Sequence, residues 1–153
     1  MTVVIIILVI VVAGGLGFYY RRKSLQREQE RLRLSVGELN SRIQRGEKMS
    51  IIDLRHPLDV LAAPQLIPGA TCISPQDVDK RMAEIPQNAE VVLYCTCPDE
   101  ASSLNTYRKM KNRGFLHVKV LTGGLPAWKK AKLPLQDLYP ELEQQMRQRA
   151  SRP

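Results

Sequence analysis

The stretch from Val91 to Arg113, VVLYCTCPDEASSLNTYRKMKNR, decides the fold. Its first four residues, 91–94, are apolar and predict a short buried strand. A polar loop, 95–100, follows, and residues 101–113 then have helix-forming composition and end before Gly114. The stretch therefore predicts a strand, a loop and a helix in direct succession.

Two further apolar runs flank this unit. Residues 49–54 (MSIIDL) and 118–121 (VKVL) each have the length of a buried strand. Strand, helix and strand in this order form a βαβ unit, which predicts a parallel sheet covered by helices. Within 101–113, the apolar residues Leu104, Tyr107 and Met110 recur at three-residue spacing. The predicted fold class is α/β, with a central parallel sheet flanked by helices.

Cys95 follows directly on the predicted strand 91–94. Ligand sites in parallel sheets lie at the carboxyl ends of strands, where a loop directs backbone N–H groups inward and the next helix begins. A thiol reacts as the thiolate, so we expect this environment to lower its pKa and to stabilise an anionic sulfur or persulfide. Cys95 is the predicted catalytic residue.

The loop carries a second thiol, Cys97, and two carboxylates, Asp99 and Glu100. Carboxylates beside a thiol oppose thiolate formation and repel dianions. Cys97 has two interpretations: a second thiol that attacks an oxidised or persulfidated Cys95, or a small residue without a chemical role. The third cysteine, Cys72, lies in 70–74, a predicted buried strand where it acts as a small hydrophobe.

Other site classes find no support. Three cysteines and two histidines show none of the common zinc spacings, and no metal or cofactor is expected. The net charge of +8 comes without a nucleic-acid motif or aromatic platform, so no nucleic-acid binding is expected. An odd number of cysteines indicates free thiols rather than a disulfide framework.

The N-terminal run from Val3 to Tyr20 contains no charged residue and is long enough to cross a bilayer as a helix. Arg21-Arg22-Lys23 follow it, and segment 21–48 holds nine Lys/Arg against four Asp/Glu. This asymmetry predicts a single-pass anchor in the lipid bilayer, with the N-terminus outside and the body in the cytoplasm. A cleaved signal peptide lacks support because no charged residue precedes the run. Small residues at 14–17 leave open an integral membrane-protein partner.

The predicted organisation has four parts. They are a transmembrane anchor (1–20), a charged juxtamembrane helix or linker (21–34), an α/β domain (35–136) and a C-terminal helical tail (137–153). Ser35 and Glu38 form a capping-box pattern for a helix that ends near Gly46. Leu138, Leu142 and Met146 recur every four residues and predict the tail helix.

Several motifs, in this order, resemble those of the rhodanese (sulfurtransferase) superfamily. They are Ile51-Ile52-Asp53-Leu54-Arg55, Ile67-Pro68-Gly69-Ala70, Val91-Val92-Leu93-Tyr94-Cys95, and Leu121-Thr122-Gly123-Gly124-Leu125-Pro126-Ala127-Trp128. The resemblance implies that Cys95 accepts a sulfane sulfur as a persulfide and passes it to a small thiol acceptor. It implies an active-site loop formed by Cys95, Thr96, Cys97, Pro98, Asp99 and Glu100, with Ala101 opening the helix. Asp53, Arg55, Gly123 and Gly124 would support that loop, and Trp128 would lie in the core.

This loop departs from the family pattern. Many family loops carry an Arg or Lys that helps to hold an anionic donor such as thiosulfate, whereas this one carries two acidic residues. Arg55 is one candidate for a compensating charge, but pairing with Asp53 is the favoured interpretation. Two functions remain: a membrane-anchored sulfurtransferase acting through Cys95, and a non-catalytic rhodanese-fold module that binds a partner at the membrane.

Overall fold

The computed structural model describes residues 14–20 and 31–139. The chain divides into two units, 1–33 and 34–153, which are considered separately. In the first unit, residues 14–20 are helical and exposed. Across the described residues, no helix has both the length and the apolar character needed to cross a membrane. Most of the predicted anchor, residues 3–13, and most of the charged segment, 21–30, lie outside the described part of the chain.

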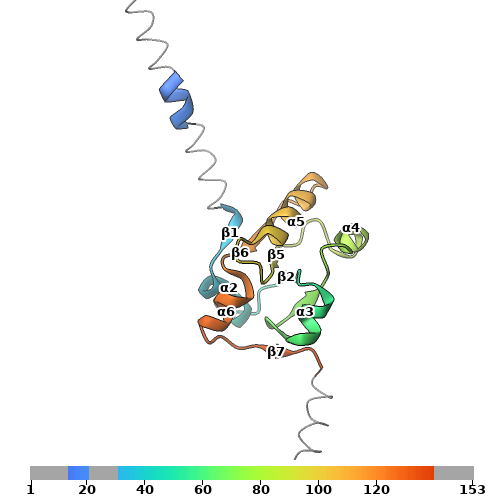
Figure 1. Ribbon diagram of the computed structural model, residues 1–153. Helices are drawn as coiled ribbons and strands as arrows, with labels where there is room; N and C mark the ends of the chain where they lie inside the picture. Colours follow the sequence, from blue (N-terminus) through green and yellow to red (C-terminus); the bar gives the residue numbers. More distant parts are fainter. Residues whose placement is uncertain (1–13, 21–30, 140–153) are drawn as a thin grey trace, which may run out of the picture. The chain divides into compact units, whose positions relative to one another are not determined.

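The second unit is built on a five-stranded sheet with the order β1-β6-β5-β2-β4 (Figure 1). β2 pairs in parallel with both β4 and β5, and β5 pairs in parallel with β6. The strands are β1 (Arg33–Leu34), β2 (Ser50–Asp53), β4 (Ala70–Cys72), β5 (Val91–Tyr94) and β6 (Val118–Leu121). The predicted parallel sheet and its three sequence-derived strands are thus confirmed.

Helices cover the sheet on both faces. α2 (Val36–Gln44) and α6 (Gly124–Lys130) pack together on one face, whereas α5 (Ala101–Asn112) lies on the other side of β5 and β6 (Figure 1). α3 (Pro57–Ala62) follows β2, and α4 (Val78–Arg81) runs into a short 3-10 helix, Met82–Glu84. A separate antiparallel ribbon joins β3 (Gln65–Leu66) to β7 (Gln136–Asp137).

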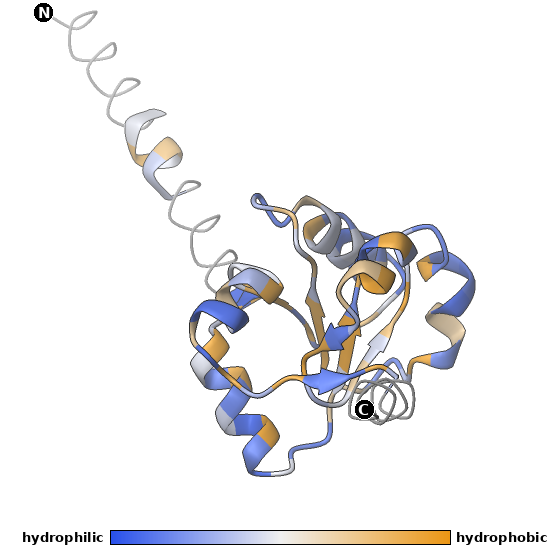
Figure 2. Cartoon of the chain, turned by 60° about the horizontal axis from the view of Figure 1, so that its bottom comes forward, coloured by the Kyte–Doolittle hydropathy of each residue, from blue (hydrophilic) through white to orange (hydrophobic). Residues whose placement is uncertain are grey.

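The core explains this layering. Figure 2 shows hydrophobic central strands enclosed by helices with hydrophilic residues on their outer faces. Side chains of β2, β5 and β6 on one face pack against α2 and α6, because alternate residues of a strand point to opposite faces. Trp128 is fully buried there, as predicted, and its indole N–H donates to the carbonyl oxygen of Pro134 over 2.8 Å.

The buried face of α5 differs from the expected one. Ser103, Thr106 and Met110 are buried, whereas Leu104 and Tyr107 are only half-buried. Two small polar residues therefore take the inner positions in the first half of the helix. This half lies beside the active-site loop, where the neighbouring groups are polar.

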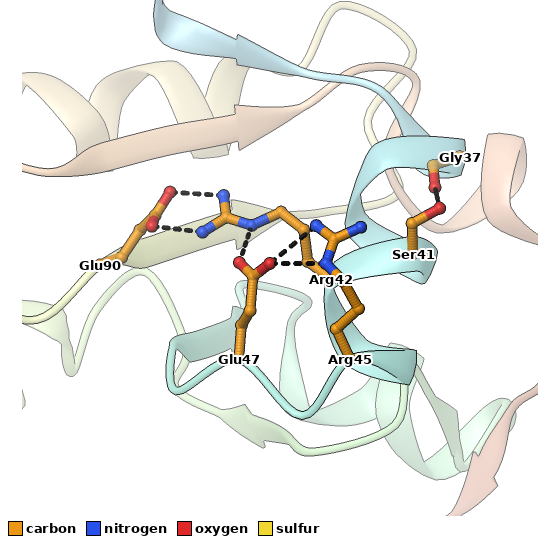
Figure 3. Close-up of polar contacts among 6 residues, drawn as sticks. All are labelled: Gly37, Ser41, Arg42, Arg45, Glu47 and Glu90. Atoms are coloured by element: carbon orange, nitrogen blue, oxygen red, sulfur yellow. Dashed lines mark hydrogen bonds and ion pairs between the residues drawn. The ribbon is translucent and has the colours of Figure 1, made fainter.

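An ion-pair cluster ties α2 to the start of β5 (Figure 3). The Arg42 guanidinium donates two hydrogen bonds to the Glu90 carboxylate and a third, of 2.6 Å, to Glu47. The hydrogen bonds from Arg42 lower the pKa of Glu90, whose neighbour Val91 begins the strand leading to Cys95. At the other end of α2, the Ser35 hydroxyl accepts from the Glu38 N–H over 3.2 Å, which confirms the predicted N-cap.

Short strands lie at both ends of the predicted domain. Residues 33–34, predicted within the charged helix or linker, form edge strand β1, where Leu34 is fully buried and its carbonyl accepts from the Thr122 N–H. At the other end, Gln136–Asp137 form β7, and the Leu138 N–H donates to the carbonyl of Pro64. Residues 138 and 139 are not helical, and the rest of the predicted tail helix, 140–153, lies outside the described residues.

Candidate active site

The carboxyl ends of three parallel strands meet at one edge of the sheet. In the sheet register, Asp53 of β2 lies between Cys72 of β4 and Tyr94 of β5. Cys95 leaves β5 at this edge and starts the loop, which ends where α5 begins at Ala101. The predicted site residues thus come together at the edge where parallel sheets bind ligands.

Backbone contacts hold Cys95 against the Gly123-Gly124 turn. The Leu125 N–H donates to the Cys95 carbonyl over 3.0 Å. Gly124 has a φ of +52°, and a Cβ at that position would lie 2.1 Å from the Cys95 carbonyl oxygen. Only glycine permits this approach, which gives a physical reason for the Gly-Gly pair.

Glu100 joins the same turn from the other end of the loop. Its side chain is 5% exposed, and its Oε1 accepts from the Gly123 N–H over 2.7 Å. Its backbone has a φ of 57°, in the left-handed region. The Glu100 carboxylate thus binds the turn, and the expectation that it opposes thiolate formation stays a prediction.

Asp99 is exposed and its Oδ1 accepts from the Ala101 N–H over 3.2 Å. This contact satisfies one of the free amides at the start of α5. The charge of Asp99 also acts to raise the pKa of Cys97, as expected for a carboxylate near a thiol. Thr96 and Pro98 are exposed and make the outer surface of the loop.

The thiol of Cys95 is buried, with the residue only 2% exposed. Burial raises its pKa, although nearby Ser103 and the Cys97 backbone N–H act in the opposite direction. The pKa of the Cys95 thiol is therefore raised rather than lowered as expected, because desolvation outweighs these hydrogen bonds. The Ser103 hydroxyl is also fully buried and has no regular hydrogen-bond partner among the described residues.

Cys97 is the more acidic thiol of the pair. Its Sγ lies 3.3 Å from the Ser102 Oγ, and this hydrogen bond is the main cause of its lowered pKa. Hydrogen bonding with Cys95 lowers it further. Of the two thiols, the half-exposed Cys97 is therefore the one that loses its proton more readily.

Sequence reasoning did not assign chemical roles to Ser102 and Ser103. The sequence feature that could have indicated such roles is the pair of adjacent hydroxyl residues in the first turn of the helix that follows the Cys95 loop. That turn directs side chains at successive positions toward different parts of the loop. Which serine meets which thiol depends on the conformation of the loop.

Asp53 and Arg55 form a buried pair at the carboxyl end of β2. Their side chains are 0% and 1% exposed, and the Arg55 Nη2 lies 2.7 Å from the Asp53 Oδ2. Arg55 also donates to the carbonyls of Ala63 and Gln65, and the Tyr94 hydroxyl donates to Asp53 over 2.8 Å. Burial and the charge of Asp53 raise the pKa of Tyr94. The favoured interpretation of Arg55 is confirmed: it binds Asp53.

Cys72 lies at the end of edge strand β4 and is half-buried, not fully buried as predicted. Its exposure follows from the position of β4 at the edge of the sheet. Burial and the charge of Asp53 raise its pKa. Within 14–20 and 31–139, no three His, Cys, Asp or Glu side chains are grouped as metal ligands would be.

The family model of the rhodanese-like domain matches residues 35–131. The chain belongs to the rhodanese-like family. The match covers the sheet strands β2 to β6 and the whole loop that starts at Cys95. A sequence relative supports the same family. The chain is 31% identical over 97 residues to a sulfurtransferase of Allochromatium vinosum, and the aligned region covers 63% of this chain and 87% of that protein.

Other relatives share only this domain. The adenylyltransferase/sulfurtransferase MoeZ of Mycobacterium tuberculosis is 30% identical over 106 residues, which cover 67% of this chain but 26% of MoeZ. The rhodanese-like domain of the Anabaena sp. Alr3790 protein superimposes with a TM-score of 0.60 at 25% identity, covering 71% of this chain and 82% of that one. A full-length protein from Lactobacillus plantarum, 20% identical, has the same fold with a TM-score of 0.68, covering 78% and 99%. The family match and the two sulfurtransferase relatives support sulfur transfer as the general function of the domain, whereas the Lactobacillus plantarum structure shows the fold alone.

Proposed function

We propose that this protein is a membrane-anchored sulfurtransferase that carries a sulfane sulfur as a persulfide on Cys95, with Cys97 as the resolving thiol. The observation that carries the proposal is the pairing of two thiols of different acidity in one loop. Cys95 is buried with a raised pKa, and Cys97 is half-exposed with a lowered pKa.

The pair supplies the nucleophile for loading. The Cys95 sulfur attacks the terminal sulfur of a persulfide donor, R–S–SH, as its proton passes to the Cys97 thiolate. The S–S bond of the donor breaks, R–S⁻ leaves, and Cys95 becomes Cys95–S–SH. The buried Ser103 hydroxyl and the Cys97 N–H lie beside this sulfur and favour its charged form.

Discharge has two routes. An acceptor thiolate attacks the outer sulfur of Cys95–S–SH and leaves as a new persulfide, which returns Cys95 to the thiolate. In the second route, the Cys97 thiolate attacks the inner sulfur, a Cys95–Cys97 disulfide forms, and HS⁻ leaves. The second route reduces the sulfane sulfur and oxidises the two thiols, so an external thiol must reduce the disulfide before the next cycle.

Mass spectrometry of the purified full-length chain tests both claims. After incubation with polysulfide, mercaptopyruvate or thiosulfate, we expect a gain of one sulfur atom on the peptide that contains Cys95. Cys95→Ser removes this gain, whereas Cys72→Ser, outside the loop, retains it. Cys97→Ser slows the formation of the persulfide, because Cys97 accepts the Cys95 proton, and it prevents the disulfide and the sulfide release that accompanies it. The proposal fails if no donor adds sulfur to the Cys95 peptide.

One observation favours a second function, a partner-binding module without catalysis. The Cys95 thiol is buried and its pKa is raised, which is unfavourable for a nucleophile. If the wild-type chain accepts no sulfur, while its fold and its retention in the membrane are unchanged in Cys95→Ser, this second function takes precedence.

The membrane anchor is part of the proposal. The uncharged run 3–20 and the cluster Arg21-Arg22-Lys23 support a single span with the N-terminus outside and the domain in the cytoplasm. Protease treatment of sealed right-side-out vesicles would then spare the domain, and inverted vesicles would expose it. Cleavage of the domain in right-side-out vesicles would refute this topology.

A further inference from the structure

An open groove with a volume of about 580 Å³ lies beside the active-site loop. It is bounded by the loop on one side, by α5 along its length and by the segment after β4 on the other side. Its lining includes Pro75, Asp99, Ser102, Leu104, Asn105 and Arg108. This volume falls within the range of small-molecule sites.

One end of the groove is lined by Asp99 and Ser102, which are neighbours of Cys97. Ser102 lines the groove, and its hydroxyl lies 3.3 Å from the Cys97 sulfur. Asp99, at the same end, is close enough for its charge to affect Cys97. Of the two thiols, Cys97 is thus the one whose partners line the groove.

The positively charged side chain of Arg108 lines the other end of the groove. Of the basic residues of α5, Lys109 pairs with Asp79, and Lys111 donates to the Leu116 carbonyl. Arg108 is exposed and has no ion pair or hydrogen bond to residues within 31–139. Ala101, Asn105 and Arg108 follow the i, i+4, i+7 pattern, so they lie on one helix face, and helical side chains lean toward the N-terminus, here toward the loop.

The polar side chains that line the groove favour a ligand with a carboxylate. The guanidinium of Arg108 and the amide of Asn105 are donors suited to a carboxylate. Ala101 and Arg108 are separated by about 10 Å along the helix axis, so the carboxylate lies well away from the sulfur. Asp99 disfavours a second anionic group near the thiols, which weighs against a compact dianion such as thiosulfate.

We propose that this groove binds the small-molecule partner of sulfur transfer, a thiol or persulfide of about tripeptide size whose carboxylate pairs with Arg108. The proposal rests on the proposed function for the transfer step itself, but binding in the groove does not require turnover. The loop 95–100 contains no Arg or Lys, so Arg108 supplies the positive charge that selects the ligand.

Binding of an unreactive probe tests the groove separately from the chemistry. Isothermal titration of the full-length chain in detergent with S-methylglutathione is expected to detect binding that Arg108→Gln weakens about tenfold, as for loss of one charge-assisted hydrogen bond. Arg108→Lys, which keeps the charge, should retain part of the affinity. Lys111→Gln removes the same charge from α5 outside the groove and should have no effect.

Kinetics then relate the groove to transfer. With glutathione persulfide as donor, Arg108→Gln should raise KM about tenfold and leave kcat nearly unchanged; with the persulfide of 2-mercaptoethanol, which has no carboxylate, neither parameter should change. The groove proposal is overturned if S-methylglutathione does not bind or binds Arg108→Gln equally well, even when Cys95 forms a persulfide. The reverse result, Arg108-dependent binding without any persulfide, overturns the proposed transfer and leaves the groove in place.

Discussion

The backbone N–H of Gly123 donates to the Oε1 of Glu100 over 2.7 Å, which joins the end of the active-site loop to the turn after β6. Together with the hydrogen bond from the Leu125 N–H to the Cys95 carbonyl, it fastens both ends of the loop to one turn. Glu100 therefore holds the loop against this turn.

Removal of the Glu100 carboxylate should loosen the loop. We expect Glu100→Ala to lower the free energy of unfolding by about 1–3 kcal/mol, because it leaves the Gly123 N–H without its acceptor. Glu100→Gln retains a side-chain oxygen and should recover most of this loss. Urea denaturation, followed by the fluorescence of Trp128, the sole and fully buried tryptophan, measures both values. Equal stability of the alanine and glutamine variants would contradict the clamp.

Gly124 should tolerate no side chain. Gly124→Ala would place a Cβ 2.1 Å from the Cys95 carbonyl oxygen at a φ of +52°, so we expect a loss of at least about 2 kcal/mol and displacement of the loop. Gly37→Ala in α2 is the matched control, since nothing lies within 4 Å of its Cβ position. That change should stabilise the chain by up to about 1 kcal/mol. Thermal unfolding of the two variants makes the comparison.

The two thiols should titrate in different pH ranges. Because the pKa of Cys97 is lowered and that of Cys95 is raised, iodoacetamide should modify Cys97 at lower pH than Cys95. Ser102→Ala should move the Cys97 midpoint upward, since it removes the hydrogen bond to the thiolate. Ser103→Ala should move the Cys95 midpoint upward instead. Peptide mass spectrometry after short pulses at each pH gives the midpoints, and a lower midpoint for Cys95 would reverse the assignment.

The stability of the fold should depend on Asp53 and Arg55 being present together. Arg55→Met leaves the fully buried Asp53 without its cation, and we expect a loss of about 3–5 kcal/mol. Asp53→Asn combined with Arg55→Met should be more stable than Arg55→Met alone, because no uncompensated charge remains. Denaturant unfolding of the single and double variants measures this coupling. A double variant as unstable as the single one would show that the hydrogen bonds of Arg55 to the Ala63 and Gln65 carbonyls matter more than charge.

The Arg42–Glu90 pair should contribute to stability in a defined pH range. Hydrogen bonds from Arg42 lower the pKa of Glu90 in the folded chain, so the contribution is present above the unfolded pKa, about 4.3, and is lost as the pH falls through the lower folded value. Glu90→Gln should therefore cost about 0.5–1 kcal/mol at pH 7 and progressively less in acid. Urea midpoints from pH 7 to pH 3 test this, with the exposed Glu84→Gln as the comparison.

Local sequence determined the strands β2, β5 and β6, the helix α5, the Ser35 cap and the position of Cys95 at a strand end, because hydrophobic periodicity and capping act over a few residues. The motifs also sufficed to indicate the family. Tertiary structure decided the rest. Leu34 and Gln136 joined strands because distant partners satisfied their backbone groups, and the Glu100 carboxylate met the Gly123 N–H. The acidity of the two thiols was likewise decided by packing, since burial and the nearest serine hydroxyl depend on contacts that residue order does not specify.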